Sequence, residues 1–415
     1  MNAGWVSKAL ADLCEIKPAK GEAKRKLKDA DLVSFVPMED LGIDQKFLVP
    51  RVERKLGQVA GSYTYFADGD VLLAKITPCF ENGKLGIARA LTNGVGFGSS
   101  EYIVFRPRAD LSNEYLYYFL LQDSFRANGI KTMSGAVGHK RVSKEFIEGC
   151  KIPLAPLSEQ GRIVAILDEA FAGLTTAVAN AEKNLKNARE LFESYLGSIF
   201  TQKCHGWTTS ELGKPVKFID YRGKTPPKKE TGIRLITAKN VKMNHIQRNP
   251  EEFIDSKVYD GWMTRGYPRK GDVLFTTEAP LGNVAQLDTD ETVVIGQRLI
   301  TMQPDDRVLD RTFLKYALMS RPTQAEIFKR GTGATVVGIK ASLLKQVPVS
   351  FPPRVSDQRA LAKEIESNAN SVAQLEEHYR RKIGDLAVLR QSILQKAFSG
   401  ELTSPLSEAI QEAAE

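Results

Sequence analysis

Two long segments of the chain place apolar residues in alternating steps of three and four. This spacing predicts two helices, each with an apolar seam like that of a coiled coil. The first seam runs through Ile163, Leu167, Ala170, Leu174, Val178, Ala181, Leu185, Ala188, Phe192, Tyr195 and Ile199. The second runs through Leu361, Ile365, Ala369, Val372, Leu375, Tyr379, Ile383, Leu386, Leu389, Ile393 and Ala397. Each helix would hold about 40 residues and extend about 60 Å.

The segments ahead of these helices contain short apolar runs separated by turn residues, a pattern that predicts strands. In the first half the runs cover 63–66, 70–74 and 102–105, and in the second half 234–237, 272–276 and 299–302. Several short strands with few helices predict a mixed α/β (α+β) globular domain in each half.

The chain repeats itself with a period of about 200 residues, so the repeated unit is a domain and not a solenoid element. The order of the matches is the same in both halves, which chance does not produce. The matching positions are Gly4-Trp5 with Gly206-Trp207, 69–72 with 271–274, Pro78 with Pro280, Gly138-His139-Lys140 with Gly338-Ile339-Lys340, Glu159-Gln160 with Asp357-Gln358, and Phe200 with Phe398.

These patterns predict a domain at 1–153, a helix at 154–202, a second domain at 203–351, a second helix at 352–402 and a tail at 403–415. We expect the two helices to form an antiparallel coiled coil with pseudo-two-fold internal symmetry, because two matched seams occur once per chain. The alternative is that each helix pairs with a second copy of the chain. The residues expected in helix packing are Leu167, Leu174, Leu185, Phe192, Ile365, Val372, Ile383 and Ile393.

Composition adds a mild excess of positive charge, with a formal net charge of +8 and a sequence pI of about 9.1 in 415 residues. That excess fits a polyanionic partner without requiring one. We expect no signal peptide and no membrane-spanning segment. The four cysteines are scattered, which favours reduced thiols and a cytoplasmic protein. The four histidines are too dispersed to predict a metal site.

No catalytic motif is evident. Gly223-Lys224-Thr225 resembles the end of a phosphate-binding loop, but Phe218 stands where that loop needs glycine. Asp272 and Glu278 lie close in sequence without a basic or metal partner, and we interpret Asp272, like Asp70, as a turn residue before a strand. The expectation is therefore a binding protein with no catalytic residues.

Basic residues cluster near glycine and proline in both halves, as expected for loops that contact phosphates and enter a DNA groove. Asn240, Asn244 and Gln297 could read adenine edges, although loop amides more often cap turns. The candidate DNA-binding residues are Lys20, Lys24, Arg25, Lys75, Lys140, Arg141, Arg222, Lys224, Thr225, Lys228, Lys239, Asn240 and Arg298.

The chain resembles the specificity subunits of type I restriction-modification systems. The resemblance rests on three runs and on the order domain, helix, domain, helix along nearly the whole chain. The runs are Lys75-Ile76-Thr77-Pro78-Cys79-Phe80-Glu81-Asn82-Gly83-Lys84, Tyr221-Arg222-Gly223-Lys224-Thr225-Pro226-Pro227-Lys228, and the Pro-Leu-Ser-Glu-Gln start at 156–160.

The resemblance implies that each globular domain is a target-recognition domain for one half of a split DNA site. The helix pair would set the spacing between the halves and dock modification subunits, two of them in this family. Those subunits carry S-adenosylmethionine and methylate adenine, and restriction subunits that use ATP and Mg²⁺ then join them. This chain would need no cofactor of its own and would contact no membrane.

Two other interpretations remain open. A coiled-coil scaffold that joins two ligand-binding domains would explain the duplication without DNA, and its DNA binding would depend little on salt. An enzyme of unrecognised type would need an asymmetric set of acid, base or nucleophile in one half, and the sequence offers none.

Overall fold

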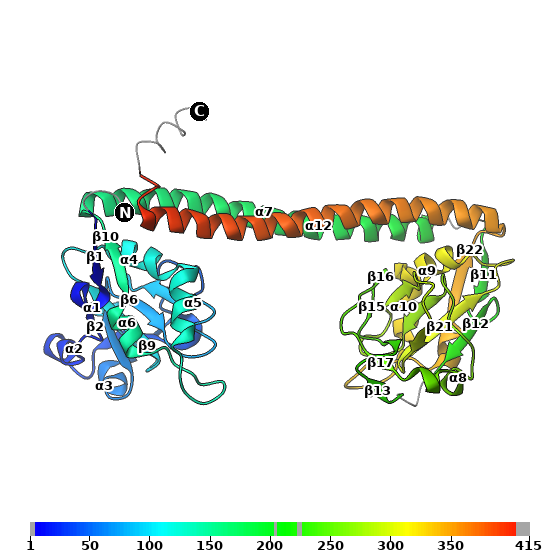
Figure 1. Ribbon diagram of the computed structural model, residues 1–415, viewed down its shortest axis with the longest axis horizontal. Coiled ribbons are helices and arrows are strands. Elements are labelled where there is room, and N and C mark those ends of the chain that lie inside the picture. The colour runs from blue at the N-terminus through cyan, green and yellow to red at the C-terminus, as the bar shows by residue number, and fades with distance from the viewer. Residues whose placement is uncertain (1–4, 203–205, 222–225, 404–415) are drawn as a thin grey trace, which may run out of the picture. The chain divides into compact units, whose positions relative to one another are not determined.

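The computed structural model describes residues 5–202, 206–221 and 226–403. It divides into two compact units, unit 1 with Met1–Asn180 and Lys382–Glu415, and unit 2 with Ala181–Arg381. Each unit contains one globular domain and one part of each long helix, α7 (Leu157–Gln202) and α12 (Val355–Ser399) (Figure 1). The mixed α/β fold with two long helices, which the sequence predicts, is therefore confirmed.

The domain of unit 1 contains two four-stranded sheets, ordered β2-β9-β6-β7 and β4-β3-β8-β5, and a two-stranded sheet β1-β10. Pairing is antiparallel except between β3 and β8. The elements are β1 Val6–Ala9, α1 Leu10–Leu13, β2 Cys14–Ile16, α2 Gly21–Lys26, β3 Leu32–Val36, η1 Met38–Asp40, β4 Val52–Lys55, α3 Leu56–Val59, β5 Thr64–Ala67, β6 Val71–Ala74, β7 Leu85–Ile87, η2 Thr92–Gly94, β8 Val95–Gly98, β9 Tyr102–Pro107, α4 Asn113–Leu120, α5 Asp123–Lys131, α6 Lys144–Gly149 and β10 Lys151–Leu154.

The domain of unit 2 repeats this plan with sheets β12-β21-β18-β19 and β13-β17-β14-β20, and with the two-stranded sheets β11-β22 and β15-β16. The pairing of β14 with β20 is parallel, like that of β3 with β8. The elements are β11 Thr208–Glu211, β12 Val216–Asp220, β13 Lys228–Lys229, β14 Ile233–Ile236, β15 Val241–Lys242, β16 His245–Ile246, β17 Phe253–Ile254, η3 Ser256–Val258, α8 Tyr259–Trp262, β18 Val273–Thr276, β19 Val284–Gln286, β20 Val293–Ile295, β21 Leu299–Pro304, α9 Arg311–Met319, α10 Arg321–Lys329, α11 Ala341–Leu344 and β22 Pro348–Phe351.

The first sheet of each domain is the conserved part of the repeat within this chain. Its central strands β6 and β18 are fully buried, which explains their continuous apolar sequences Val71–Ala74 and Val273–Thr276. The second sheet differs in one edge strand. In unit 1 this strand is β5, which pairs with β8, whereas in unit 2 it is β13, which pairs with β17. The six sequence-predicted strands correspond to β5, β6, β9, β14, β18 and β21.

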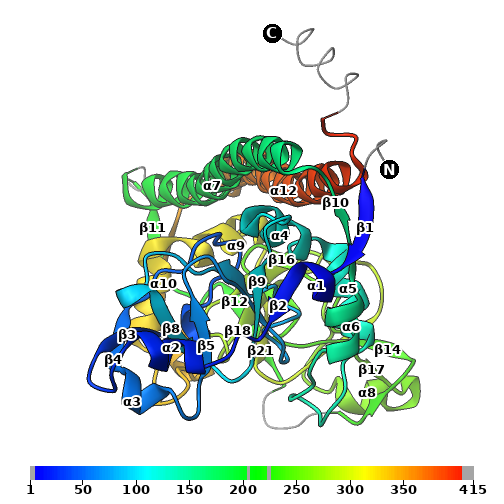
Figure 2. The ribbon, with the colours of Figure 1, turned by 90° about the vertical axis from the view of Figure 1, so that its left-hand side faces the viewer.

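In unit 1, α4 lies between the long helices and the sheets (Figures 1 and 2). Ile163 and Leu167 of α7 pack in one core with Phe398 of α12. Glu159 near the start of α7 contacts Thr403, which follows α12. Phe171, farther along α7, contacts Arg390, which precedes Thr403 in the chain. The two helix segments of this unit are therefore antiparallel.

In unit 2 the second part of α7 packs against the first part of α12. The hydroxyl of Tyr195 donates to Glu364 at 2.7 Å, and Arg189 lies 3.3 Å from Glu376. The contacts again move backward along α12 as they move forward along α7, so this pairing is antiparallel too. Each pair of segments lies within one chain, as the sequence predicts.

All eight predicted helix-packing residues are buried or partly buried. Two of the expected seam positions, Leu375 and Leu389, are instead 44% and 47% exposed, so the seam prediction is wrong there. A straight helix drifts from a strict heptad pattern, which carries some seam residues out of the interface. Leu167 and Ile365 are buried, and the partly buried residues are Leu174, Leu185, Phe192, Val372, Ile383 and Ile393.

The expectation that no segment is apolar enough to cross a membrane needs a correction. By length and composition the stretch Leu157–Thr201 of α7 passes that test, with a mean hydropathy of 1.4 over its most apolar window. The same helix contributes buried residues to the cores of both units and places Asp168 in an ion pair with Lys46. Only 17% of that apolar window is buried, so most of it is left exposed by the described residues.

Candidate nucleic-acid interface

The basic candidates of unit 1 form two separate groups. Lys20, Lys24 and Arg25 lie at and on the short helix α2. The amine of Lys20 donates to the carbonyl oxygen of Gly61 at 2.9 Å, while Lys24 and Arg25 are exposed. This first group can supply phosphate contacts, but Lys20 is partly engaged inside its own domain.

The second group, Lys75, Lys140 and Arg141, gathers where β6 ends. Ser134 pairs with Arg141 at the base of a hairpin, and Ile76 pairs with Arg141 on its other side. The guanidinium of Arg141 donates to both carboxylate oxygens of Glu101, at 2.9 and 2.8 Å. The sequence did not single out Glu101, because an acid forty residues away gives no local signal of such a contact.

Charge is concentrated at this hairpin base. Burial lowers the pKa of Lys75, which also faces Glu101, Lys17 and Arg141. The hydrogen bond from Arg141 lowers the pKa of Glu101. Lys75 and Arg141 thus both face Glu101, and Lys17 lies near Lys75, so the group has the net positive character that a phosphate backbone attracts.

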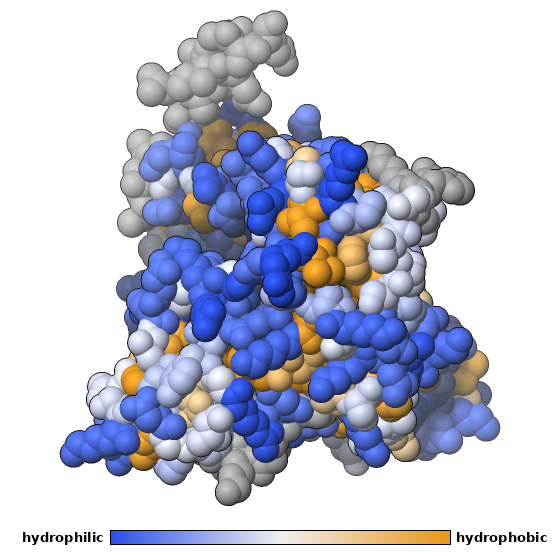
Figure 3. Space-filling model, turned by 90° about the vertical axis from the view of Figure 1, so that its right-hand side faces the viewer, coloured by the Kyte–Doolittle hydropathy of each residue, from blue (hydrophilic) through white to orange (hydrophobic). Residues whose placement is uncertain are grey.

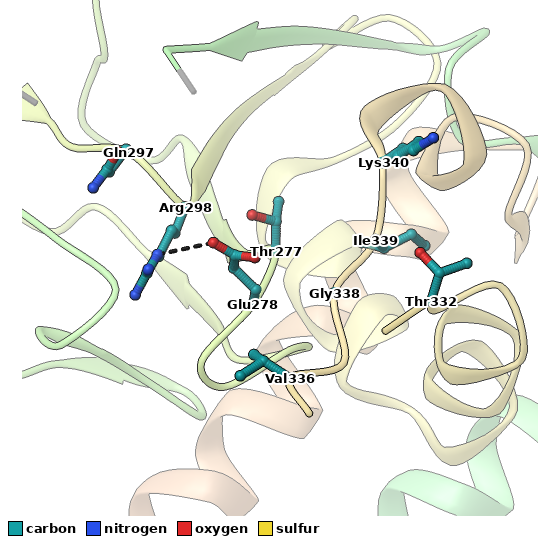
Figure 4. Close-up of a pocket in the computed structure, with 9 residues that line it drawn as sticks. All are labelled: Thr277, Glu278, Gln297, Arg298, Thr332, Val336, Gly338, Ile339 and Lys340. Atoms are coloured by element: carbon teal, nitrogen blue, oxygen red, sulfur yellow. Dashed lines mark ion pairs between the residues drawn. The ribbon is translucent and has the colours of Figure 1, made fainter. Parts of the chain in front are cut away.

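Unit 2 has a pocket of about 250 Å³ at the corresponding place, lined by Thr277, Glu278, Gln297, Arg298, Thr332, Val336, Gly338, Ile339 and Lys340. The Nε atom of Arg298 lies 2.9 Å from Oε1 of Glu278, and both side chains are about half exposed. Figure 4 shows Glu278 turned toward Arg298, with Gln297 beside it and Lys340 on the other side of the pocket. Hydrogen-bond donors and acceptors therefore line one small opening.

The remaining candidates of unit 2 are scattered. Lys228 forms an ion pair with Glu252 at 2.8 Å, and Lys239 is exposed in the turn after β14. Arg222, Lys224 and Thr225 lie outside the described residues. Hydrophilic residues dominate the outer face of this domain in Figure 3, so exposed charge alone does not mark an interface.

Asn240 is a correction. Its side chain is buried, and its amide nitrogen donates to the carbonyl oxygens of Gln247, Arg248 and Pro250. Its oxygen accepts from the backbone N–H and the hydroxyl of Thr237. Because these hydrogen bonds occupy both the oxygen and the nitrogen of a buried amide, Asn240 cannot read a base edge. Its side chain instead bridges two turns.

The hairpins of the two units also correct the alignment of the repeat. The sequence matches Gly138 with Gly338, but in the structure Gly338 takes the place of Arg141. Both residues pair at the base of a hairpin whose first loop residue is a glycine with positive φ, 125° at Gly135 and 126° at Gly333. The second hairpin is one residue shorter, with 333–337 against 135–140 between the paired positions, and sequence reasoning had no signal for this deletion.

This arrangement is suited to binding. The guanidinium, carboxylate and amide groups at the two hairpin bases can recognise base edges or phosphates. The buried carboxylates Asp70 and Asp272 accept hydrogen bonds from the backbone of Ala67 and Arg269, which confirms their interpretation as turn residues. Over residues 5–202, 206–221 and 226–403, no three His, Cys, Asp or Glu side chains gather in a group that could hold a metal ion.

Comparisons with known proteins bear on both domains. A family model described as "Type I restriction modification DNA specificity domain" matches residues 2–187. The EcoAI specificity subunit of Escherichia coli is 34% identical over 197 residues, which are 47% of this chain and 33% of that protein. The MjaVIII specificity subunit of Methanocaldococcus jannaschii is 22% identical over 418 residues, covering 93% of this chain and 91% of that protein. The match to the Escherichia coli protein thus spans about a third of its length.

Two solved structures share the fold. A chain from a study of complex assembly and conformational transition of the type I R-M system has a TM-score of 0.78 at 22% identity, covering 97% of this chain and 99% of that chain. The HsdS subunit from Thermoanaerobacter tengcongensis has a TM-score of 0.60 at 22% identity, covering 97% and 98%.

Proposed function

This chain belongs to the family of type I restriction-modification specificity subunits, and from that premise we propose that it recognises a split DNA sequence, with each globular domain reading one half. The observation that carries the proposal is the repeated hairpin base. Both domains place an Arg–Glu pair beside the hairpin base, with one member, Glu101 or Arg298, at the equivalent position before β9 or β21. A single-site enzyme would not need this duplication.

The exposed cations of both domains would supply the affinity for DNA. Lys24, Arg25 and Lys140 in unit 1 and Lys239 and Arg298 in unit 2 are exposed. Each phosphate neutralised by such a cation releases counterions, so the affinity should fall steeply as salt rises. A scaffold with no nucleic-acid partner would show little of this dependence.

The long helices would set the spacing of the two half-sites and dock the partner subunits. α7 has 46 residues and α12 has 45, and at about 1.5 Å per residue each is roughly 70 Å long. Leu191 and Val388 remain 66% and 69% exposed on these helices, as expected for a surface that another helix covers. The partners would be two modification subunits, followed by restriction subunits.

The chemistry would belong to those partners. We expect S-adenosylmethionine in the modification subunits and ATP with Mg²⁺ in the restriction subunits, while this chain positions DNA without a catalytic residue or cofactor of its own. A protein that works on host DNA in this way would act in the cytoplasm.

The test is to co-purify the chain with the modification subunit encoded beside it and to map methylated adenines in host DNA. We expect methylation at a split motif. Replacing residues 1–153 with the corresponding domain of a relative should change one half of the motif, and replacing 203–351 should change the other. Absence of both a bound modification subunit and a split motif would reject the proposal in favour of the scaffold.

A further inference from the structure

One position in the shared framework carries opposite charges in the two domains. Glu101 immediately precedes β9, and Arg298 immediately precedes β21. The two are equivalent because the backbone N–H of Lys75 donates to the carbonyl of Glu101 at 3.0 Å, as that of Thr277 does to Arg298 at 2.9 Å. The framework therefore holds an acid at this place in unit 1 and a base in unit 2.

Each charge is paired, but the partner comes from a different neighbour. In unit 1 the base is Arg141, on the hairpin. In unit 2 the hairpin position holds Gly338, and the acid is Glu278. A Cβ atom on Gly338 would lie 3.1 Å from Cβ of Glu278, so a larger hairpin residue would crowd that acid. Both units therefore have an Arg–Glu pair, but the arginine lies on the hairpin in unit 1 and next to the sheet in unit 2.

The hairpins that border these pairs expose apolar residues at their tips. Val137 is 94% exposed, and Val336 and Val337 are 51% and 43% exposed. A branched apolar residue at the tip of an exposed loop is unfavourable in water, and it fits contact with a thymine methyl group or insertion between base steps.

The backbone of Arg298 adds a second sign of function in unit 2. Its φ is 70°, a left-handed conformation that is costly for a residue with a side chain. Such strain persists only where the surrounding structure fixes the conformation, and it is frequent at binding sites. Here it accompanies a guanidinium that is half exposed beside Gln297.

We propose that the pairs Glu101–Arg141 and Glu278–Arg298, each with its hairpin tip, are the base-reading elements of the two domains, and that each pair reads one G·C base pair. The inference rests on the proposed function. The guanidinium would bond to O6 and N7 of guanine, and the carboxylate would accept from N4 of cytosine. Because the pair is reversed between the domains, the guanine lies on the hairpin side in unit 1 and on the sheet side in unit 2.

The experiment uses the full chain in complex with the modification subunit. Arg298→Ala and Glu278→Gln test unit 2, and Arg141→Ala and Glu101→Gln test unit 1. The readouts are the methylated motif in host DNA and the selection of DNA by the purified complex from a randomised pool. The matched control is Arg248→Ala, which removes another exposed Arg–Glu pair, Arg248–Glu251, in unit 2.

We expect each arginine variant to lose discrimination at one G·C pair in one half-motif only, by about 10-fold to 100-fold. Arg248→Ala should leave both halves unchanged. Thermal unfolding will check that each variant folds, and co-purification will check that it still binds the modification subunit.

Three outcomes would overturn the inference. A wild-type half-motif without a G·C pair excludes the proposed contact in that domain. A split motif that no variant alters excludes these residues while leaving the proposed function intact. A uniform loss of affinity for all sequences, with a shallower salt dependence, makes the arginines phosphate contacts. A wild-type complex with no split motif rejects the proposed function itself.

Discussion

Asp70 in unit 1 and Asp272 in unit 2 occupy the same place, immediately before the central strand of the first sheet, but they face different partners. Asp70 accepts two hydrogen bonds from the guanidinium of Arg106 on β9, both at 2.8 Å. The equivalent residue on β21 is Gln303, whose amide donates to Asp272 at 2.6 Å. The positive charge in unit 2 comes instead from Arg311 of α9, at 2.8 Å.

This comparison separates what the fold requires from what it leaves open. Both aspartates are buried and both accept a backbone N–H in the turn before the strand. An uncompensated buried carboxylate is expensive, so some donor must face it, but the donor can come from a strand or from a helix. The turn is fixed in both domains, while the compensating charge has changed position.

The largest effect expected from this difference is in the pair of substitutions Asp70→Asn and Asp272→Asn. Asp70→Asn breaks both charged hydrogen bonds to Arg106, which keeps only one, to Glu22 at 2.6 Å, and should lower the unfolding free energy of unit 1 by about 3 kcal/mol. Asp272→Asn should cost unit 2 only about 1 kcal/mol, because Arg311 keeps two hydrogen bonds to Asp306, both at 2.9 Å. Hydrogen exchange followed by mass spectrometry measures each unit separately.

Asp110→Asn is the control, since Asp110 is 70% exposed and 3.9 Å from its cation. It should change neither unit. Equal costs for the two buried aspartates would mean that the strand arginine and the helix arginine are interchangeable, and the distinction drawn between the domains would fail.

The two units share one set of side-chain contacts completely, so matched substitutions there should lower the unfolding free energy of both units equally. Gln160 and Gln358 are completely buried near the starts of α7 and α12. Each side-chain oxygen accepts a backbone N–H at 2.8 Å, from Ser112 and Asp310 respectively. Each amide nitrogen donates to two backbone carbonyls of its own unit.

Gln160→Ala and Gln358→Ala should each lower the unfolding free energy of their own unit by about 2 kcal/mol, because buried backbone groups lose their partners. Increased hydrogen exchange at the start of α4 or α9 would report the loss. The exposed Gln395→Ala and Gln374→Ala are matched controls. If one glutamine proved much less costly than the other, the two helix junctions would not be equivalent despite their identical contacts.

The sequence predicted the features that arise from local periodicity. The two long helices follow from the three-and-four spacing, and the buried strands β6 and β18 follow from their apolar runs. The shared glutamines were visible as a matched position of the repeat. These signals work because a helix or strand repeats its environment over neighbouring residues.

The contacts that give the candidate site its chemistry were not predictable in the same way. Glu101 meets Arg141, and Glu278 meets Arg298, only because strand pairing brings distant segments together. The sequence match of Gly138 with Gly338 was also three residues away from the structural equivalence of Arg141 with Gly338. Asn240 shows the converse error, since its type fitted base reading while its buried position excludes it.

The smallest expected effect concerns α4 and α9, where Tyr117 in unit 1 is replaced by Lys315 in unit 2. Each lies five residues after the residue that caps the start of its helix, Ser112 or Asp310. Lys315 is buried, its amine is 3.7 Å from Glu366, and burial lowers its pKa below 10.5. A depressed pKa of a base means that the stability it contributes is present above the unfolded-state pKa and is lost as pH falls through the folded-state value.

Replacing this lysine with an apolar residue should therefore help unit 2 most at neutral pH. We expect Lys315→Met to raise the unfolding free energy of unit 2 by about 1 kcal/mol at pH 7, because a poorly paired buried charge is removed. The gain should shrink as pH rises and should disappear above 10.5, where the wild-type lysine is neutral in both states. Lys144→Met, at a lysine that is 77% exposed, should show neither effect. If Lys315→Met instead lowers the unfolding free energy at pH 7, the Lys315–Glu366 contact is a stabilising ion pair. Unit 2 would then gain from this ion pair the stability that unit 1 gains from burying Tyr117.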